Sequence, residues 1–213
     1  MSPYPNPAAD ADDFRENRLL AALPPASLDA LRPYFEAVSC GIKDMVYRPN
    51  EPISHVLFPR GGVFSLLAVG DEEGGLVEVA TIGNEGFVGL PVFLGADTSS
   101  VMAFCQVPGD AWRISSGPFR AAVEADAALA AVLNRHVMAL FTQTAQAAFC
   151  NRTHQMVQRC ARWLLMTHDR VGGDEFLLTH EFLAQMLGVR RASVSEAVKP
   201  LQDAGLIAYS RGQ

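Results

Sequence analysis

No uninterrupted apolar run in this sequence approaches about 18 residues, the length that a membrane-spanning helix needs, although apolar residues make up 49% of the chain. The first residues also lack the basic-then-apolar order of a signal peptide. Cysteine is scarce, and its positions are too scattered for a disulfide framework: Cys40, Cys105, Cys150 and Cys160. These absences argue against a membrane-spanning protein and against a disulfide-stabilised secreted one. They predict a cytoplasmic protein with reduced thiols.

Motifs of catalysis are missing as well. The sequence contains no Gly-x-Ser-x-Gly, no phosphate-binding loop and no His-Glu-x-x-His. The region of short apolar runs holds one histidine, His55, whereas a cupin-type metal site needs several histidines and a carboxylate. Cys150, His154 and Cys160 are too loosely spaced to form a closed metal site. We therefore expect no enzyme, no metal and no other cofactor. A haem held by His55 or His136 stays open, but nothing selects it.

The net charge of −6 is unfavourable for DNA binding, but the charge is unevenly distributed. Acidic residues outnumber basic ones up to Phe149, whereas basic residues outnumber acidic ones from Cys150 onward. Because attraction to phosphates acts locally, this asymmetry suits a sensor fused to a DNA-binding domain. The overall acidity also leaves an alternative open, namely a ligand-binding or protein-interaction module without a direct role on DNA.

Glycine, proline and the apolar runs divide the chain into parts. Residues 1–18, with their prolines and aspartates, are expected to form a disordered leader. From residue 19 to residue 117, a short helical stretch precedes brief apolar runs such as Val63–Val69 and Leu76–Ile82. Short strands at this spacing predict an antiparallel β-roll, with Asp71–Glu73 at a hairpin tip.

A long helix is predicted over residues 118–152. Pro118 suits the first turn of a helix, and glycine is absent from residue 118 to residue 171. Five residues recur with alternating spacings of four and three, as in the seam of a two-stranded coiled coil: Leu133, Val137, Leu140, Thr144 and Ala147. We interpret this segment as a dimerisation helix. The alternative of a helix that lies on its own β-domain stays open.

The segment that begins at Thr179 meets the requirements of a helix-turn-helix in one window. Thr179 can cap the first helix. Ala184 is small, as required where the second helix crosses the first, and Gly188 tolerates the positive φ of the tight turn. Apolar residues occupy the positions that clamp the two helices together: Leu183, Leu187, Val189, Val194 and Ala197. We therefore predict a helix-turn-helix within a C-terminal domain, residues 153–213.

The side chains predicted to contact DNA lie on the second helix and at its flanks. Arg191 is the first candidate for base reading, because arginine can donate two hydrogen bonds to guanine O6 and N7. Arg190 and Lys199 suit phosphate contacts, and Glu196 could accept a hydrogen bond from cytosine N4. The predicted set is Thr179, Arg190, Arg191, Ser193, Ser195, Glu196, Lys199 and Arg211.

The flanks of this motif carry three further expectations. Pro200 falls inside the second helix, where proline costs roughly 3 kcal/mol, so we expect a kink or an early end there. Phe176–Leu178 predicts a short strand before the motif, and residues 206–212 predict the first strand of a wing. Because a hairpin needs two strands and the sequence stops at Gln213, we expect this chain to be part of a longer protein.

The order of β-roll, long helix, hinge and C-terminal winged helix-turn-helix resembles the Crp/Fnr family, named after the cyclic-AMP receptor protein and the fumarate-nitrate reduction regulator. The resemblance covers residues 19–213, and its marker segments are Gly83–Pro91 and Gly188–Val194. It implies an α+β fold with a cyclic-nucleotide-binding-like jelly roll. It also implies a homodimer that binds a pseudo-palindromic promoter site on double-stranded DNA and recruits or blocks RNA polymerase.

The roll departs from members of the family that bind cyclic AMP. Those members hold the ribose with a Glu after a Gly and the phosphate with an Arg-Ser pair. The corresponding residues are Gly89-Leu90 and Ser99-Ser100, and no Lys or Arg occurs between Arg60 and Arg113. Because a cyclic phosphate in a half-buried pocket needs a charged bidentate partner, we expect a different small-molecule effector or none. The candidate effector pocket comprises Phe87, Gly89, Leu90, Ser99, Ser100, Met102 and Thr144.

Overall fold

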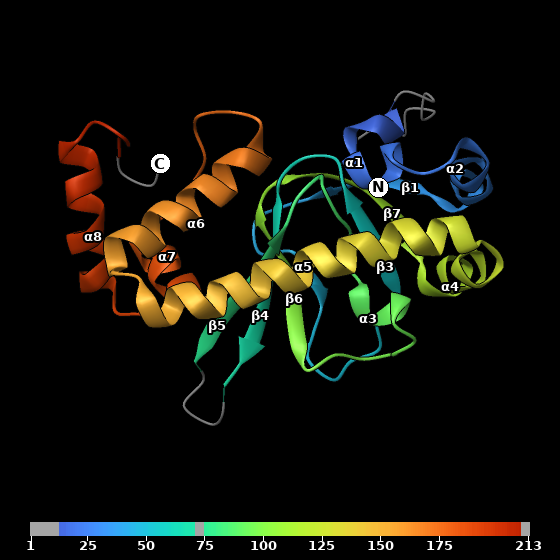
Figure 1. Cartoon of the computed structure of the whole chain (residues 1–213), viewed down its shortest axis with the longest axis horizontal. Helices are drawn as coiled ribbons and strands as arrows, with labels where there is room; N and C mark the ends of the chain where they lie inside the picture. The colour runs from blue at the N-terminus through green and yellow to red at the C-terminus, as the bar shows by residue number, and fades with distance from the viewer. Residues whose placement is uncertain (1–12, 71–74, 210–213) are drawn as a thin grey trace, which may run out of the picture.

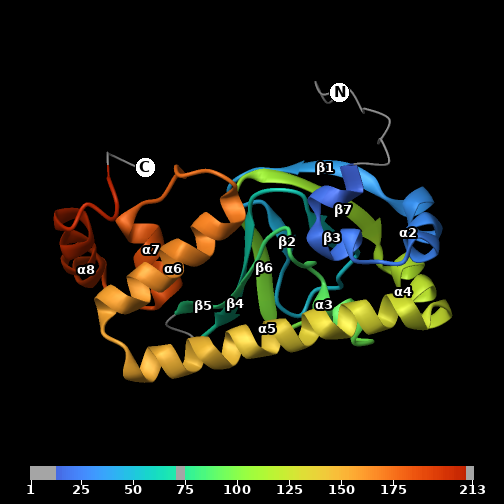
Figure 2. The ribbon, with the colours of Figure 1, turned by 45° about the horizontal axis from the view of Figure 1, so that its top comes forward.

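The computed structural model describes residues 13–70 and 75–209 (Figure 1). Two sheets occupy the middle of the molecule, short N-terminal helices lie at one end and three C-terminal helices lie at the other. A helix of 27 residues, α5 (Ala127–Thr153), runs along the molecule beside the strands (Figure 2). This arrangement confirms the predicted α+β fold. Within the described ranges, no helix is long and apolar enough to cross a membrane.

Both sheets of the roll are antiparallel between the strands that the structure describes. The first has the order β1 (Glu36–Cys40), β7 (Gly109–Ser115), β3 (His55–Pro59). The second has the order β2 (Met45–Tyr47), β6 (Val101–Val107), β4 (Val63–Val69), β5 (Leu76–Ile82). Side chains from both sheets, including Phe58, Phe64 and Ile114, form one buried core. The predicted hairpin tip Asp71–Glu73 lies outside the described residues.

The N-terminal helices are packed on the roll, so the leader predicted over residues 1–18 extends too far. They are the 3₁₀ helices η1 (Asp13–Glu16) and η2 (Arg32–Tyr34) and the α-helices α1 (Arg18–Ala21) and α2 (Pro25–Leu31). Phe14 is buried and stacks on Trp112, with ring centroids 4.4 Å apart. Asn17 is also buried, and its Nδ2 donates hydrogen bonds to the carbonyl oxygens of Pro59 and Gly86. These long-range contacts, which local composition does not reveal, order residues 14–17.

Two helices replace the single helix predicted over residues 118–152. The first is α4 (Ser116–Ala125), and the second is α5. Asp126 separates them with φ −127° and ψ 99°, and its Oδ1 accepts hydrogen bonds from the backbone N–H groups of Ala128 and Leu129. The break is therefore an N-cap, which satisfies N–H groups that the start of α5 would otherwise leave unpaired.

The predicted coiled-coil seam of α5 lies largely on the roll. Leu133 and Leu140 are only 0% and 6% exposed and belong to the core of the roll. Val137 and Ala147 are half-buried, and Thr144 is exposed. The interpretation of Leu133 and Leu140 as contacts of a dimer is therefore wrong, because the helix uses them to cover its own domain.

The C-terminal part consists of α6 (Met156–Val171), α7 (His180–Leu187) and α8 (Arg191–Asp203). Neither Phe176–Leu178 nor the described part of residues 206–212 forms a strand, so both strand predictions are wrong there. Neither extended segment pairs with a neighbouring strand, and an isolated strand is not stable. Phe176, Leu178 and Ile207 instead pack against the helices.

The C-terminal helices share a hydrophobic core with the second sheet. Leu67 on β4 and Phe104 on β6 are buried in the same cluster as Trp163 of α6 and Met186 of α7. The rings of Phe104 and Phe182 meet edge to face at 6.2 Å. One face of this sheet therefore covers the roll's core, and the other holds the C-terminal helices in place.

A chain of hydrogen bonds crosses the same boundary, and we call its five residues the polar bridge: Ser65, Glu78, Gln106, Trp163 and Thr167. Trp163 Nε1 donates to Glu78 Oε1 at 2.8 Å, and Ser65 Oγ lies 2.8 Å from Glu78 Oε2. Ser65 also contacts Gln106 Oε1, and Gln106 Nε2 donates to Thr167 Oγ1 at 3.4 Å. The three sheet residues come from neighbouring strands, and Trp163 and Thr167 are one turn apart on α6.

The number of protons available for hydrogen bonding in this bridge indicates that the Glu78 carboxyl group is protonated and uncharged. Ser65 has one hydroxyl proton, yet its Oγ faces acceptor oxygens of both Glu78 and Gln106. If the carboxyl group carries a proton, it donates to Ser65, and Ser65 then donates to Gln106. Burial raises the pKa of Glu78 to about 7, although the hydrogen bonds from Ser65 and Trp163 and the charge of Arg170 lower it.

An ion pair at the edge of the contact adds a second link. Arg170 Nη2 of α6 lies 2.8 Å from Glu85 Oε1, and both side chains are largely shielded from solvent. The stem of Arg170 passes over Gly83, where an added Cβ would lie only 2.7 Å from the arginine Cγ. Gly83 therefore makes room for this link, which gives a packing role to the first residue of the marker segment Gly83–Pro91.

We predict that attachment of α6 to the sheet weakens as the pH rises. Burial raises the pKa of Glu78 from its ordinary value of 4.5 to about 7 in the attached state. The protonated group therefore stabilises attachment fully below about pH 4.5, and this stabilisation is lost as the pH rises through 7. The loss is on the order of 3 kcal/mol. Trp163 fluorescence in a Trp112→Phe background should follow this transition, and Glu78→Gln, which keeps a neutral donor, should abolish it. His168→Gln is the control on α6. A profile that survives in Glu78→Gln would contradict the assignment.

Candidate nucleic-acid interface

The first helix of the predicted motif begins and ends as its sequence requires. Thr179 is the N-cap of α7, and its Oγ1 accepts a hydrogen bond from the backbone N–H of Phe182 at 3.1 Å. Gly188 ends the helix with φ 63°, in the left-handed region that favours glycine. Its backbone N–H bonds to carbonyl oxygens of the last turn. Both local predictions are confirmed.

The second helix, α8, crosses the first on the predicted apolar residues. Leu183, Ala184 and Val194 are 1%, 3% and 0% exposed, and Ala197 is buried with them. Leu187 and Val189 are partly buried against the same cluster. The two helices therefore hold each other in a fixed orientation, which is the geometric requirement of a helix-turn-helix.

An early end of α8 at Pro200 was one of the two outcomes expected from the sequence, and it does not occur. The helix continues to Asp203, and the N–H of Ala204 bonds to the carbonyl of Pro200. Leu201 is 8% exposed and anchors the final turn in the C-terminal cluster. Tertiary packing therefore compensates for the hydrogen bond that proline cannot make.

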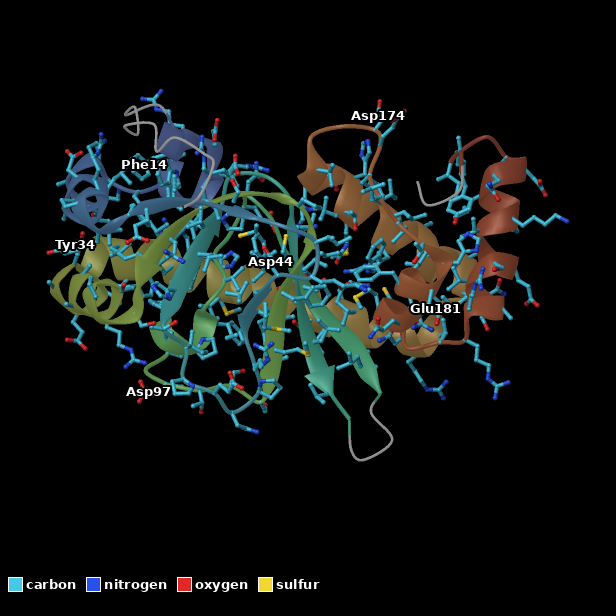
Figure 3. The ribbon with its side chains drawn as sticks, turned by 180° about the vertical axis from the view of Figure 1, so that it is seen from behind. Phe14, Tyr34, Asp44, Asp97, Asp174 and Glu181 are labelled. Atoms are coloured by element: carbon cyan, nitrogen blue, oxygen red, sulfur yellow. The ribbon has the colours of Figure 1, made fainter. Side chains whose placement is uncertain are left out.

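The predicted DNA-contacting side chains lie on the outer side of this unit. Arg191 is the first residue of α8 and Arg190 is its N-cap, so both stand at the end of the helix that follows the turn. The exposed members are Thr179, Arg190, Arg191, Ser195, Glu196 and Lys199, and Ser193 is half-buried. Arg211 lies outside the described residues. Glu181 of α7 and Asp174, which precedes α7, lie in this half of the molecule, opposite Phe14 and Tyr34 (Figure 3).

The residues of the candidate effector pocket lie in different surroundings. Phe87 is buried in the core of the roll, where it stands 5.2 Å from the ring of His136. Met102 packs instead against the cluster of the C-terminal helices. Gly89, with φ 121°, precedes α3 (Leu90–Phe93). The structure therefore does not place Phe87 and Met102 in one cluster.

The remaining members of that set are nearer the surface. Ser99 lies on the loop before β6, and its Oγ accepts a hydrogen bond from the backbone N–H of Val101. Ser100 is exposed on the same loop. Thr144 of α5 donates to the carbonyl of Leu140. Among the residues described, no group of three or more His, Cys, Asp or Glu side chains could hold a metal ion.

Sequence reasoning missed the residues that hold the interface in place. Glu78 and Trp163 are separated by 85 positions, and Gln106 and Thr167 by 61. A polar residue in a strand and a Trp in an amphipathic helix carry no signal that they will meet. The only local hint was Gly83, which lay in a marker segment without an assigned role.

Comparison with known proteins agrees with this geometry. Residues 158–213 match the model of the Crp-like helix-turn-helix domain. A search of curated proteins finds no match by sequence. Several solved structures share the fold over most of the chain.

Three of these structures span most of the molecule. A putative transcriptional regulator of the Crp/Fnr family from Eubacterium rectale has a TM-score of 0.72 at 18% identity, covering 93% of this chain and 92% of its own. FixK2 from Bradyrhizobium japonicum has a TM-score of 0.70 at 16% identity, covering 83% and 89%. CLP from Xanthomonas campestris, described as a c-di-GMP responsive global regulator, has a TM-score of 0.68 at 18% identity, covering 88% and 96%.

The matched domain is a helix-turn-helix, a DNA-binding motif, and the similar structures show the fold of the rest of the chain. The chain therefore carries a Crp-like helix-turn-helix domain at residues 158–213, and its fold is similar to that of solved regulators of the Crp/Fnr type.

Proposed function

We propose that the chain binds a pseudo-palindromic promoter site as a homodimer, with α8 of each subunit in the major groove, and that it recruits or blocks RNA polymerase there. The observation that carries this proposal is the exposed polar face of α8 above a buried helix-turn-helix core. In this architecture the N-terminal end of the second helix meets the bases. Arg190 and Arg191 stand at that end.

The exposed side chains suit different parts of DNA. Arg191 can donate two hydrogen bonds to guanine O6 and N7, and Glu196 can accept one from cytosine N4. Arg190, Lys199 and the hydroxyl of Thr179 suit phosphate oxygens, which fix the position of the helix without reading sequence. Ser193 and Ser195 can bond to either. The side chains at the turn, Arg190 and Arg191, are therefore positively charged, whereas those farther along α8 carry both signs, with Glu196 and Lys199.

We predict that Arg191→Ala and Arg190→Ala have different effects. On a duplex selected from random DNA by the full chain, Arg191→Ala should cost about 1–3 kcal/mol per half-site and relax preference at one base pair. Arg190→Ala should weaken selected and scrambled DNA alike and reduce the salt dependence by about one charge. Fluorescence anisotropy at two salt concentrations measures both. An Arg191→Ala protein that keeps its full ratio of selected to scrambled binding would remove this residue from base reading.

The surface of α5 that faces away from the roll supports the proposed dimer. Met138, Phe141 and Phe149 are 61%, 67% and 57% exposed. With Ala145 they recur every three or four residues, so they form one apolar stripe on the helix. We name these four residues the outer stripe of α5. It lies opposite Leu133 and Leu140, and a second copy of the same helix would bury it as in a coiled coil.

We predict that Met138→Glu with Phe141→Glu produces monomers and weakens DNA binding. Charges at the centre of a helix–helix contact would be buried without partners, which disfavours association. Light scattering should give about twice the mass of 23.0 kDa for the wild type and the single mass for the variant. Ala139→Glu, exposed on the flank of the same helix, is the matched control and should remain dimeric. A monomeric wild type at micromolar concentration would refute the dimer.

The roll is proposed to respond to a ligand other than cyclic AMP, or to none. Leu90 is partly buried against the roll's core, and the hydroxyl of Ser99 is engaged by the backbone of Val101. Neither side chain can neutralise a cyclic phosphate or bond bidentately to it. No Lys or Arg lies between Arg60 and Arg113 to take over that role.

We therefore predict that titration with cyclic AMP gives no measurable heat up to roughly millimolar concentration, which corresponds to binding weaker than about −4 kcal/mol. DNA binding by the same sample should be unchanged when the nucleotide is added. The DNA measurement also verifies that the protein is folded and active. Micromolar affinity in the calorimeter would overturn the proposal.

A further inference from the structure

His180 of α7 contacts Ser195 of α8, one of the residues predicted to bind DNA. It is the first residue of α7, and its Nδ1 lies 3.0 Å from Oγ of Ser195 on α8. The ring of Tyr209 covers the imidazole, with centroids 4.6 Å apart and an angle of 32° between the rings. Ser195 itself is exposed on the outer side of α8. The imidazole is thus held in one orientation beside the hydroxyl of an exposed serine.

The environment of the other ring nitrogen decides where the proton lies. His180 Nε2 is buried and has no hydrogen-bond partner within the described part of the chain. In protein interiors, an N–H group without an acceptor is rarer than an acceptor without a donor. The unpaired Nε2 is therefore best read as the acceptor nitrogen of the ring. A neutral imidazole here therefore carries its proton on Nδ1. It follows that Nδ1–H donates and Ser195 Oγ accepts.

We propose that His180 is a positioning residue that makes Ser195 a hydrogen-bond donor toward DNA. With its oxygen engaged by His180, the serine hydroxyl is free to point its proton outward from α8. Its partner on DNA would be an acceptor, either a phosphate oxygen or an acceptor on a base edge, such as guanine O6 or N7 or thymine O4. This inference rests on the proposed function, since it assigns a role within the same DNA-binding face.

Without His180, the Ser195 hydroxyl could form a competing hydrogen bond within α8. A serine in a helix commonly donates back to the carbonyl four residues earlier, which for Ser195 is that of Arg191. The proton would then be used inside the helix and would not reach the nucleic acid. The contact with His180 leaves that proton available, and the stacked Tyr209 restricts rotation of the imidazole.

The tautomer can be measured without DNA. Nitrogen-15 NMR of the full chain at alkaline pH should give the pattern of an imidazole protonated on Nδ1 for His180, assigned by its loss in His180→Phe. Ser195→Ala should shift this signal, whereas His168→Phe should leave it unchanged. An imidazole protonated on Nε2 would overturn the proposal.

The functional role is tested by a double-variant cycle on the selected duplex. Ser195→Ala should weaken binding about three- to tenfold, the range of one hydrogen bond. His180→Phe keeps the stacking on Tyr209 but lacks the donor, so it should cause part of that loss. The double variant should bind no more weakly than Ser195→Ala alone. Thermal unfolding of each variant verifies that the helix-turn-helix is intact.

The outcomes separate this inference from the proposed function. An equal loss on selected and scrambled DNA assigns the acceptor to phosphate, and a loss confined to the selected duplex assigns it to a base. Losses that add in the double variant, or no loss in Ser195→Ala, would refute the role of His180 while DNA binding by the wild type stands. A wild type that binds no DNA would instead refute the proposed function.

Discussion

The contact between Trp163 and Glu78 is the interaction on which the placement of the DNA-binding helices depends. It joins α6 to the middle of the second sheet, within a shared core that includes Leu67 and Phe104. The hydrophobic cluster, the flanking ion pair and the short link between α5 and α6 also join the two halves, but they impose less directional geometry than this hydrogen bond. Because a buried polar group is costly unless it is bonded, the polar bridge favours one arrangement of the halves over others.

The parts of the fold that follow from neighbouring residues could be predicted from the sequence. Thr179 and Gly188 act on backbone groups within a few residues, so their roles as cap and turn are visible in the letters alone. Strand spacing in the roll is similarly local. The contacts of Phe14, Asn17 and Trp163 join residues far apart in the chain, and neither composition nor periodicity encodes such pairs.

The helix α5 illustrates why periodicity identified an apolar face but not its partner. This helix is apolar on two sides: Leu133 and Leu140 face the roll, and the outer stripe faces solvent. A spacing of three and four residues is compatible with either side. The sequence pattern selected the side of Leu133 and Leu140, because five residues there recur with alternating spacings of four and three. Only the position of the sheet distinguishes the two.

The spacing within α6 limits which C-terminal domains could be joined to this roll. Trp163 and Thr167 reach the sheet because they lie one turn apart, and inserting a single residue between them would rotate one of them by about 100° away from it. A foreign DNA-binding domain joined after α5 would also meet Glu78 without an indole to satisfy it. A domain exchanged at the link before α6 would therefore keep this contact only if it carried both side chains at the same spacing.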